Sequence, residues 1–190
     1  MDENSDSSEE LEAIMKNSIK ELLENALNCK KNKDYNNMKD LYEVAINKGS
    51  YIAMHNFAYY YNEIEKNYDE GKRLYELAIS NNYTPSMNNL AIYYQNIEKN
   101  YDEARRLYKL AISHRSIKAM FNLGCLYDKV EQDYGKAKKY YKMAIEKNHV
   151  NAMYNLSIIY EEIEKDQEKA DKYLGMATYN GCVIEYEDDE

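Results

Sequence analysis

The chain repeats one residue pattern every 33 positions, with no insertion or deletion over four successive copies. Columns of identical residues mark this register: Met54, Met87, Met120 and Met153; Asn56, Asn89, Asn122 and Asn155; Tyr61, Tyr94, Tyr127 and Tyr160. A fixed period of this size is typical of a stacked array, in which each copy buries its apolar face against its neighbours. The register therefore predicts a repeat protein before any single residue is considered.

Each copy contains two stretches whose apolar residues recur every three or four positions, the spacing of one helical face. The first stretch, helix A, includes Ala53, Met54, Phe57, Ala58, Tyr60, Tyr61 and Ile64. The second, helix B, includes Gly71, Leu74, Tyr75, Ala78 and Ile79. The pattern predicts an all-α chain of about five antiparallel helix pairs with a 33-residue repeat.

The residues that flank helix B agree with this division. Each helix B follows an Asp or Asn, which are good N-caps: Asp34, Asn67, Asn100, Asp133 and Asp166. The column that ends helix B holds Gly49, Asn82, Arg115, Asn148 and Gly181. Gly and Asn readily adopt the left-handed conformation that closes a helix. We therefore expect the turn at Arg115 to be differently shaped or mildly strained.

The array has an atypical beginning and acidic ends. We expect residues 1–8 to be an acidic disordered tail and residues 182–190 an acidic C-terminal tail, because runs of like charge stay solvated. Residues 9–181 are predicted to form a single repeat domain, with a capping helix over 9–33 and repeats from 34 onward. The cap departs from the helix A pattern, since Leu23 occupies the Asn column.

Charge and composition exclude several function classes. The net charge is −9, but six acidic residues at the start and five at the end leave about +2 on residues 13–184, which argues against nucleic acid. No apolar run is long enough for a membrane span, and no signal peptide is apparent. We therefore expect a cytoplasmic protein, in the host cytoplasm if the source is viral. Three dispersed cysteines and three histidines predict reduced thiols and no metal or cofactor.

The helix A string Ala119, Met120, Asn122, Leu123 and Tyr127, followed by Tyr134 and then Ala137, Tyr140, Tyr141 and Ala144, resembles the Sel-one-like repeats. These are relatives of the tetratricopeptide repeat, and the resemblance covers about residues 34–181. It implies a right-handed α-solenoid with helix A lining the concave side. It also implies an adaptor or scaffold for protein–protein interaction, and no reaction.

One arc of helix A varies between copies and is unusually apolar for a solvated stripe. Core columns must keep their chemistry for the stack to repeat, whereas a ligand-facing column is free to differ. We therefore predict a peptide-binding groove on this arc, which also includes Ile52 and Asn62. Its variable residues are His55, Tyr59, Asn88, Ile92, Phe121, Cys125, Tyr154 and Ile158.

The asparagine column lies beside this arc and permits two interpretations. A row of side-chain amides can bind the backbone of an extended peptide, and the resemblance suggests this role for Asn56, Asn89, Asn122 and Asn155. The alternative is that these amides tie adjacent helices together. The first interpretation predicts that Asn122→Ala weakens partner binding more than stability.

The sequence thus favours a non-enzymatic adaptor that binds an extended peptide or partner segment on the concave helix A surface. The alternative is a structural protein that self-associates by end-to-end stacking of arrays. The expected partner is a protein or peptide, with no nucleic acid and no membrane.

Overall fold

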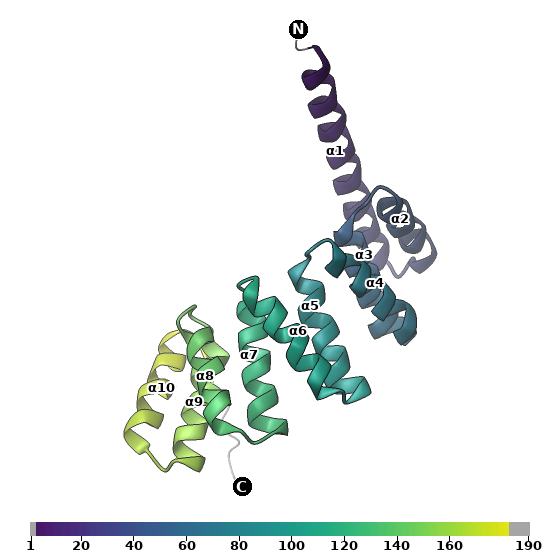
Figure 1. The fold of residues 1–190 in the computed structure, drawn as a ribbon. Helices are drawn as coiled ribbons and strands as arrows, with labels where there is room; N and C mark the ends of the chain where they lie inside the picture. Colours follow the sequence, from purple (N-terminus) through teal and green to yellow (C-terminus); the bar gives the residue numbers. More distant parts are fainter. Residues whose placement is uncertain (1–2, 183–190) are drawn as a thin grey trace. The chain divides into compact units, whose positions relative to one another are not determined.

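The computed structural model describes residues 3–182, and within this range it contains ten α-helices, four short π-helical turns and no strand (Figure 1). The helices are α1 (Glu3–Lys31), α2 (Tyr35–Asn47), α3 (Tyr51–Tyr60), α4 (Tyr68–Ser80), α5 (Thr84–Tyr93), α6 (Tyr101–Ser113), α7 (Ile117–Cys125), α8 (Tyr134–Ile145), α9 (Val150–Ile158) and α10 (Gln167–Tyr179). The π-helical turns are η1 (Tyr61–Glu65), η2 (Tyr94–Glu98), η3 (Leu126–Val130) and η4 (Ile159–Ile163). The prediction of an all-α chain built from repeated helix pairs is confirmed.

The helices group into two compact units, Met1–Ser86 and Met87–Glu190. In the first unit α1 packs on α2, α2 on α3, and α3 on α4. In the second unit α6 to α10 pack in the same sequential manner. Packing between sequence neighbours is what a repeat array requires. The single domain over residues 9–181 stays a prediction.

The apolar stripes of helix A and helix B form the core of each unit. In α3 the residues Ala53, Met54 and Phe57 are buried, and Leu74 and Tyr75 of α4 are buried with them. The equivalent tyrosines of the second unit, Tyr108 and Tyr141, are at most 1% exposed. One large aromatic residue from helix B therefore fills each interior repeat.

All five predicted N-caps of helix B are confirmed. The side chains of Asp34, Asn67, Asn100, Asp133 and Asp166 each accept a hydrogen bond from a backbone N–H in the first turn. Two helices A have equivalent caps that the sequence prediction missed, because Ser50 and Ser116 accept from the backbone N–H groups of Ala53 and Ala119. These bonds satisfy donors that a helix start leaves unpaired.

The link between helix A and helix B is a π-helical turn, which the α-helical spacing did not predict. In η1 the backbone N–H of Lys66 donates to the carbonyl of Tyr61, and Lys66 then closes the turn with a φ of +56°. The wider turn rotates the following residues away from the core face. The prediction that Ile64 belongs to the buried face is therefore wrong, since its side chain is 48% exposed.

The turn at Arg115 has the same shape as its counterparts, so the prediction of a different shape is wrong. Arg115 has a φ of +63°, against +58° for Asn82 and +59° for Asn148. Its N–H donates to the carbonyl of Ile112, as the N–H of Asn82 donates to that of Ile79, both at 2.8 Å. The helix-closing hydrogen bonds thus impose the left-handed conformation even on arginine.

This geometry predicts that Arg115→Gly raises the free energy of unfolding by about 0.5–1 kcal/mol, because glycine removes the steric cost that a side chain incurs in the left-handed region. Urea denaturation measures the change. Gly49→Ala is the opposite control and should lower the free energy of unfolding. Gly49 has a φ of +82°, and an added methyl group would meet no heavy atom within 4 Å, so the only cost is that of the left-handed backbone conformation. A loss of stability in Arg115→Gly would show that its side chain outweighs the backbone strain.

An ion pair joins helix B of one repeat to the end of the π-helical turn, or the residue just after it, in the next repeat, and it recurs in register. Lys39 pairs with Glu65 in the first unit, while Arg105 pairs with Glu131 and Lys138 with Glu164 in the second. The hydroxyl of Tyr60 also donates to Glu65, at 3.0 Å. Hydrogen bonding from Lys39 lowers the pKa of the Glu65 carboxyl below its usual value, even though partial burial opposes this shift.

The lowered pKa of Glu65 gives this pair a defined pH dependence. Its stabilisation is present above the ordinary pKa of a glutamate and is lost as the pH falls through the lowered folded-state value. We expect Glu65→Gln to lower the free energy of unfolding by about 0.2–1 kcal/mol at neutral pH and by less at about pH 3. Urea denaturation at both pH values measures this, with Glu63→Gln as the control because its pair with Lys66 is more exposed. An effect independent of pH would contradict the ion-pair account.

The long helix α1 begins at Glu3, whereas the sequence predicts a disordered tail over residues 1–8. No Pro or Gly interrupts this segment, so its sequence is compatible with a continuous helix. Figure 1 shows α1 running well beyond α2. Residues 183–190 of the predicted C-terminal tail lie outside the described residues.

Candidate functional site

An open groove of about 380 Å³ lies between α1 and α3 in the first unit. Ile19 and Leu23 of α1 stand 33 residues before Ile52 and Asn56 of α3, so the groove combines the same two columns of consecutive helices A. Ile52 belongs to the predicted variable arc, and Asn56 is a predicted peptide-binding residue. The other six lining residues are on α1, which the sequence prediction did not include in the binding face.

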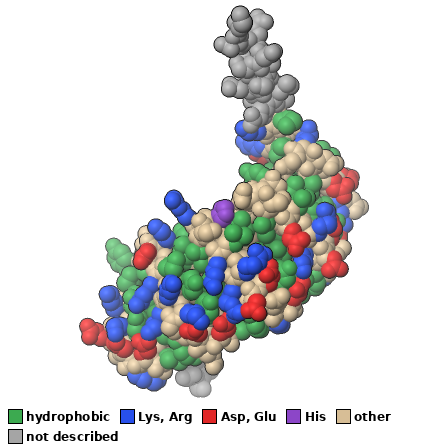
Figure 2. Space-filling model, viewed as in Figure 1, with side chains coloured by type: hydrophobic (Ala, Val, Ile, Leu, Met, Phe, Trp, Pro, Cys, Tyr) green, Lys and Arg blue, Asp and Glu red, His purple; other side chains and the backbone are tan. Residues whose placement is uncertain are grey.

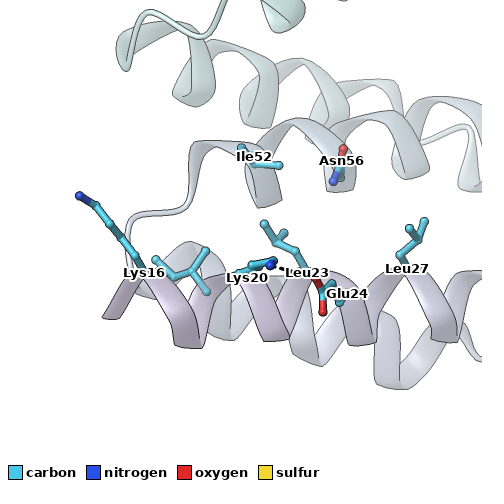
Figure 3. Close-up of a pocket in the computed structure, with 8 residues that line it drawn as sticks. Lys16, Lys20, Leu23, Glu24, Leu27, Ile52 and Asn56 are labelled. Atoms are coloured by element: carbon cyan, nitrogen blue, oxygen red, sulfur yellow. Dashed lines mark ion pairs between the residues drawn. The ribbon is translucent and has the colours of Figure 1, made fainter. Parts of the chain in front are cut away.

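The floor of the groove is apolar and its rim is polar. Ile19, Leu23, Leu27 and Ile52 supply aliphatic surface, and Lys16, Lys20, Glu24 and Asn56 supply polar groups. Figure 3 shows Leu23 and Leu27 directed from α1 towards α3, with Ile52 and Asn56 on α3 across from them and Lys16 at one end. Leu27 and Ile52 are 49% and 38% exposed, which leaves apolar surface available to a ligand.

Two other predicted groove residues of the first unit make contacts within the protein. His55 Nδ1 lies 2.9 Å from Ser86 Oγ, and the His55 ring packs against those of Tyr75 and Tyr83. The ring of Tyr59 is 43% exposed and lies 4.9 Å from the ammonium group of Lys30. His55 is therefore half-buried between repeats, whereas Tyr59 remains accessible.

In the second unit, the asparagines connect consecutive helices A. Asn122 of α7 donates from Nδ2 to Asn88 Oδ1 of α5 at 2.9 Å, and Asn88 Nδ2 lies 3.5 Å from Asn89 Oδ1. Asn88 is only 5% exposed. The prediction of Asn88 as a ligand-facing residue is corrected, because its amide is engaged in the junction between repeats. Asn62, which the same arc includes, is also buried.

A second polar cluster surrounds the hydroxyl of Tyr141. This hydroxyl donates to Asp128 Oδ2 at 3.0 Å, and Asn155 Nδ2 lies 3.2 Å from the Tyr141 oxygen. Cys125 Sγ contacts both Tyr141 and Asn155. Burial raises the pKa of the Cys125 thiol. The thiolate is therefore disfavoured, and this cluster has the character of a structural junction rather than a reactive centre.

The remaining predicted residues of the second unit are half-buried. Phe121 stacks on His149, with ring centroids 4.5 Å apart and an interplanar angle of 21°. Burial lowers the pKa of the His149 imidazole. Ile92, Tyr154 and Ile158 share the same intermediate exposure. These side chains lie on the helix A face of the second unit and remain partly accessible.

The sequence prediction missed a pairing between helix A and helix B. Tyr108 donates to Gln95 Oε1 at 3.0 Å, just as Tyr141 donates to Asp128, and both pairs are 13 residues apart. The signal was present in the register, since a polar residue recurs 13 positions before each of these tyrosines. A buried hydroxyl needs a hydrogen-bond partner, so Gln95 and Asp128 each have a structural role as acceptors.

The surface carries both signs of charge. Figure 2 shows Lys and Arg side chains intermingled with Asp and Glu on the visible face, with hydrophobic side chains between them. This mixture differs from the continuous basic surface that phosphate backbones require. Among the described residues, no helix is long and apolar enough to cross a membrane.

The stacked helix pairs, repeated caps and repeated ion pairs define an α-helical repeat array. The Sel1 repeat model matches residues 52–83, 84–115, 117–149 and 150–182, so the chain belongs to the Sel1 repeat family. Repeats of this kind generally mediate protein–protein interactions, and the family is typically a non-catalytic scaffold. The resemblance noted from the helix A columns is confirmed.

Solved structures show the same fold at low sequence identity. A Sel1 repeat protein from Oxalobacter formigenes aligns with a TM-score of 0.66 and 20% identity over 84% of this chain and 70% of its own. The c5321 antigen of uropathogenic Escherichia coli aligns with a TM-score of 0.65 and 20% identity. The alignment covers 77% of this chain and 34% of the antigen. PilF of Pseudomonas aeruginosa aligns with a TM-score of 0.72 and 15% identity. The alignment covers 90% of this chain and 79% of PilF. No curated protein matches the chain.

Proposed function

We propose that this chain is a non-enzymatic adaptor or scaffold whose helix A face holds an extended segment of a partner protein. The observation that carries the proposal is the open apolar groove between α1 and α3. Burial of its exposed aliphatic side chains would contribute about 0.8 kcal/mol for each CH₂ removed from water. Affinity would then come chiefly from Ile52, Leu23 and Leu27.

Asn56 differs from the asparagines of the second unit in a way that supports this role. Asn122 and Asn155 donate to side chains of neighbouring helices, whereas Asn56 lines the groove. Its amide can donate to and accept from a peptide backbone of any sequence. We therefore assign the peptide-binding role to Asn56 and the structural role to Asn122 and Asn155.

A matched pair of variants separates these roles. We expect Asn122→Ala to lower the free energy of unfolding by about 1–3 kcal/mol, because it leaves the buried Asn88 carbonyl without its donor. We expect Asn56→Ala to leave stability nearly unchanged and to weaken partner binding. This revises the expectation that Asn122→Ala affects binding more than stability. Urea denaturation and isothermal titration with the same partner measure both quantities.

Crosslinking mass spectrometry on the full chain, with the partner recovered from the native host, tests the binding face. The proposal expects crosslinks from Lys16 and Lys20, which flank the groove on α1. Crosslinks confined to lysines of helix B, such as Lys109 and Lys142, would refute it. The cytoplasmic location remains a prediction from the sequence.

End-to-end stacking of arrays has less support. Lys39, Arg105 and Lys138 each pair with the following repeat, but Asp171 of α10 occupies the same column and accepts from Gln167 Nε2. The last helix B thus lacks the cation that joins one repeat to the next.

A further inference from the structure

The groove between α1 and α3 has a chemistry that restricts what it can bind. Its floor is aliphatic along Leu23, Leu27 and Ile52, and its two lysines, Lys16 and Lys20, lie towards one end. Lys20 also pairs with Glu24 at 3.8 Å, but both side chains are at least 65% exposed, so this pair is weak. A fitting ligand is an extended segment with apolar residues at one end and acidic residues at the other.

The C-terminal segment Val183–Glu190 of this chain has that composition. It begins with Val183 and Ile184, contains Tyr186, and ends in four consecutive acidic residues. In an extended strand, alternate side chains point to the same side, so Ile184 and Tyr186 would face one surface together. Glu185 and Glu187 would then face the opposite side.

The lengths also agree. The part of α1 that lines the groove runs from Lys16 to Leu27, about 16 Å at the helical rise of 1.5 Å per residue. About five residues of extended chain cover the same distance at roughly 3.3 Å each. Residues 183–187 would therefore span the groove from Leu27 to Lys16, with Glu187 and the acidic residues after it at the lysine end.

We propose that the α1/α3 groove binds the C-terminal segment Val183–Glu190 of a second copy of this chain. The segment follows the last repeat, whereas the groove belongs to the first, and repeats of an array contact only their sequence neighbours. Such a contact joins two different surfaces of the chain, so when it is repeated from copy to copy it links them in series. The inference rests on the proposed function, because it assigns an occupant to the same groove.

Three measurements on the full chain test this assignment. Sedimentation velocity should show association that rises with protein concentration and that deletion of residues 183–190 abolishes. A labelled peptide of residues 183–190 should bind the full chain in fluorescence anisotropy. Replacement of Ile184 and Tyr186 in this peptide by serine should weaken its binding by about tenfold. Raising the salt concentration should also weaken binding, because Lys16 and Lys20 are near the surface.

A matched pair of variants localises the peptide. Ile52 and Leu77 are 38% and 37% exposed, but only Ile52 lines the groove. Ile52→Asp should weaken binding of the peptide by about tenfold or more, whereas Leu77→Asp should weaken it by less than about twofold. Equal binding to both variants, or a chain that stays monomeric and does not bind the peptide, would overturn the proposal. If the C-terminal segment occupies the groove to the same extent at every protein concentration, the assignment to a second copy is wrong.

These outcomes are separable from failure of the adaptor function. If the peptide does not bind while foreign-partner crosslinks still fall on Lys16 and Lys20, only the C-terminal occupant is wrong. If partner crosslinks fall on helix B while the peptide binds in the groove, the adaptor proposal fails and the self-contact stands.

Discussion

Leu123→Ala is expected to lower the free energy of unfolding by about 2–5 kcal/mol, because Leu123 is fully buried in α7 and its loss leaves a cavity. Leu123 lies in the second unit, where α6 and α8 both pack against α7. Each repeat depends on its neighbours for burial, so a cavity in α7 weakens two interfaces.

Urea denaturation followed by circular dichroism measures this change. Leu77→Ala is the control, since its side chain is 37% exposed and its truncation should cost much less. Comparable losses in the two variants would show that the Leu123 column is not the core that its burial indicates.

Gly71→Ala is expected to destabilise the protein by about 1–2 kcal/mol, although alanine is usually the better helix former by about 1 kcal/mol. A Cβ on Gly71 would lie 1.8 Å from Asn62 Oδ1, which is far inside contact distance. Asn62 is buried, so its side chain cannot swing freely into solvent. Ala104, Ala137 and Ala170 occupy the same column in the other repeats.

The double variant Asn62→Ala/Gly71→Ala isolates the cause. Removal of the Asn62 amide creates space for the new methyl group, and it removes a buried oxygen that has no hydrogen-bond partner among the described residues. We expect the double variant to recover at least the stability lost in Gly71→Ala. Thermal unfolding of the four proteins in this cycle measures the coupling, and additive effects would contradict the clash.

The sequence was sufficient for the repeat, the helix pairs and the caps of helix B, because these features depend on local spacing. Asp34 and Asn67 are good examples, since each cap lies immediately before an apolar stripe and forms the bond that its residue type predicts. That the first helix is a cap, inferred from Leu23 in the asparagine column, stays a prediction.

The π-helical turns could not be predicted in the same way. The spacing that places Ile64 on the core face assumes a constant α-helical angle, and the wider turn in η1 breaks that assumption. The shape of the turn at Arg115 shows the converse effect, because backbone hydrogen bonds fix a conformation that its residue type disfavours.

Residues in one column differ between repeats for two reasons that a single sequence does not separate: packing against the next repeat and adaptation to a ligand. Position 55 and its equivalents differ partly because each residue matches the following repeat: His55 contacts Tyr83, and Phe121 stacks on His149. Such compensating changes look the same as adaptation to a ligand. Only exposure and contacts distinguish Asn88, which is buried, from Ile52, which is not.

Binding of a partner segment in the groove between α1 and α3 is the central claim. Isothermal titration of the purified partner into the Ile52→Asp and Leu77→Asp variants tests it most directly, because the two side chains are nearly equally exposed and only Ile52 lines the groove. If the groove is the binding site, Ile52→Asp weakens binding by about tenfold or more and Leu77→Asp changes it by less than about twofold. Unchanged affinity in Ile52→Asp, or a loss confined to Leu77→Asp, would contradict it.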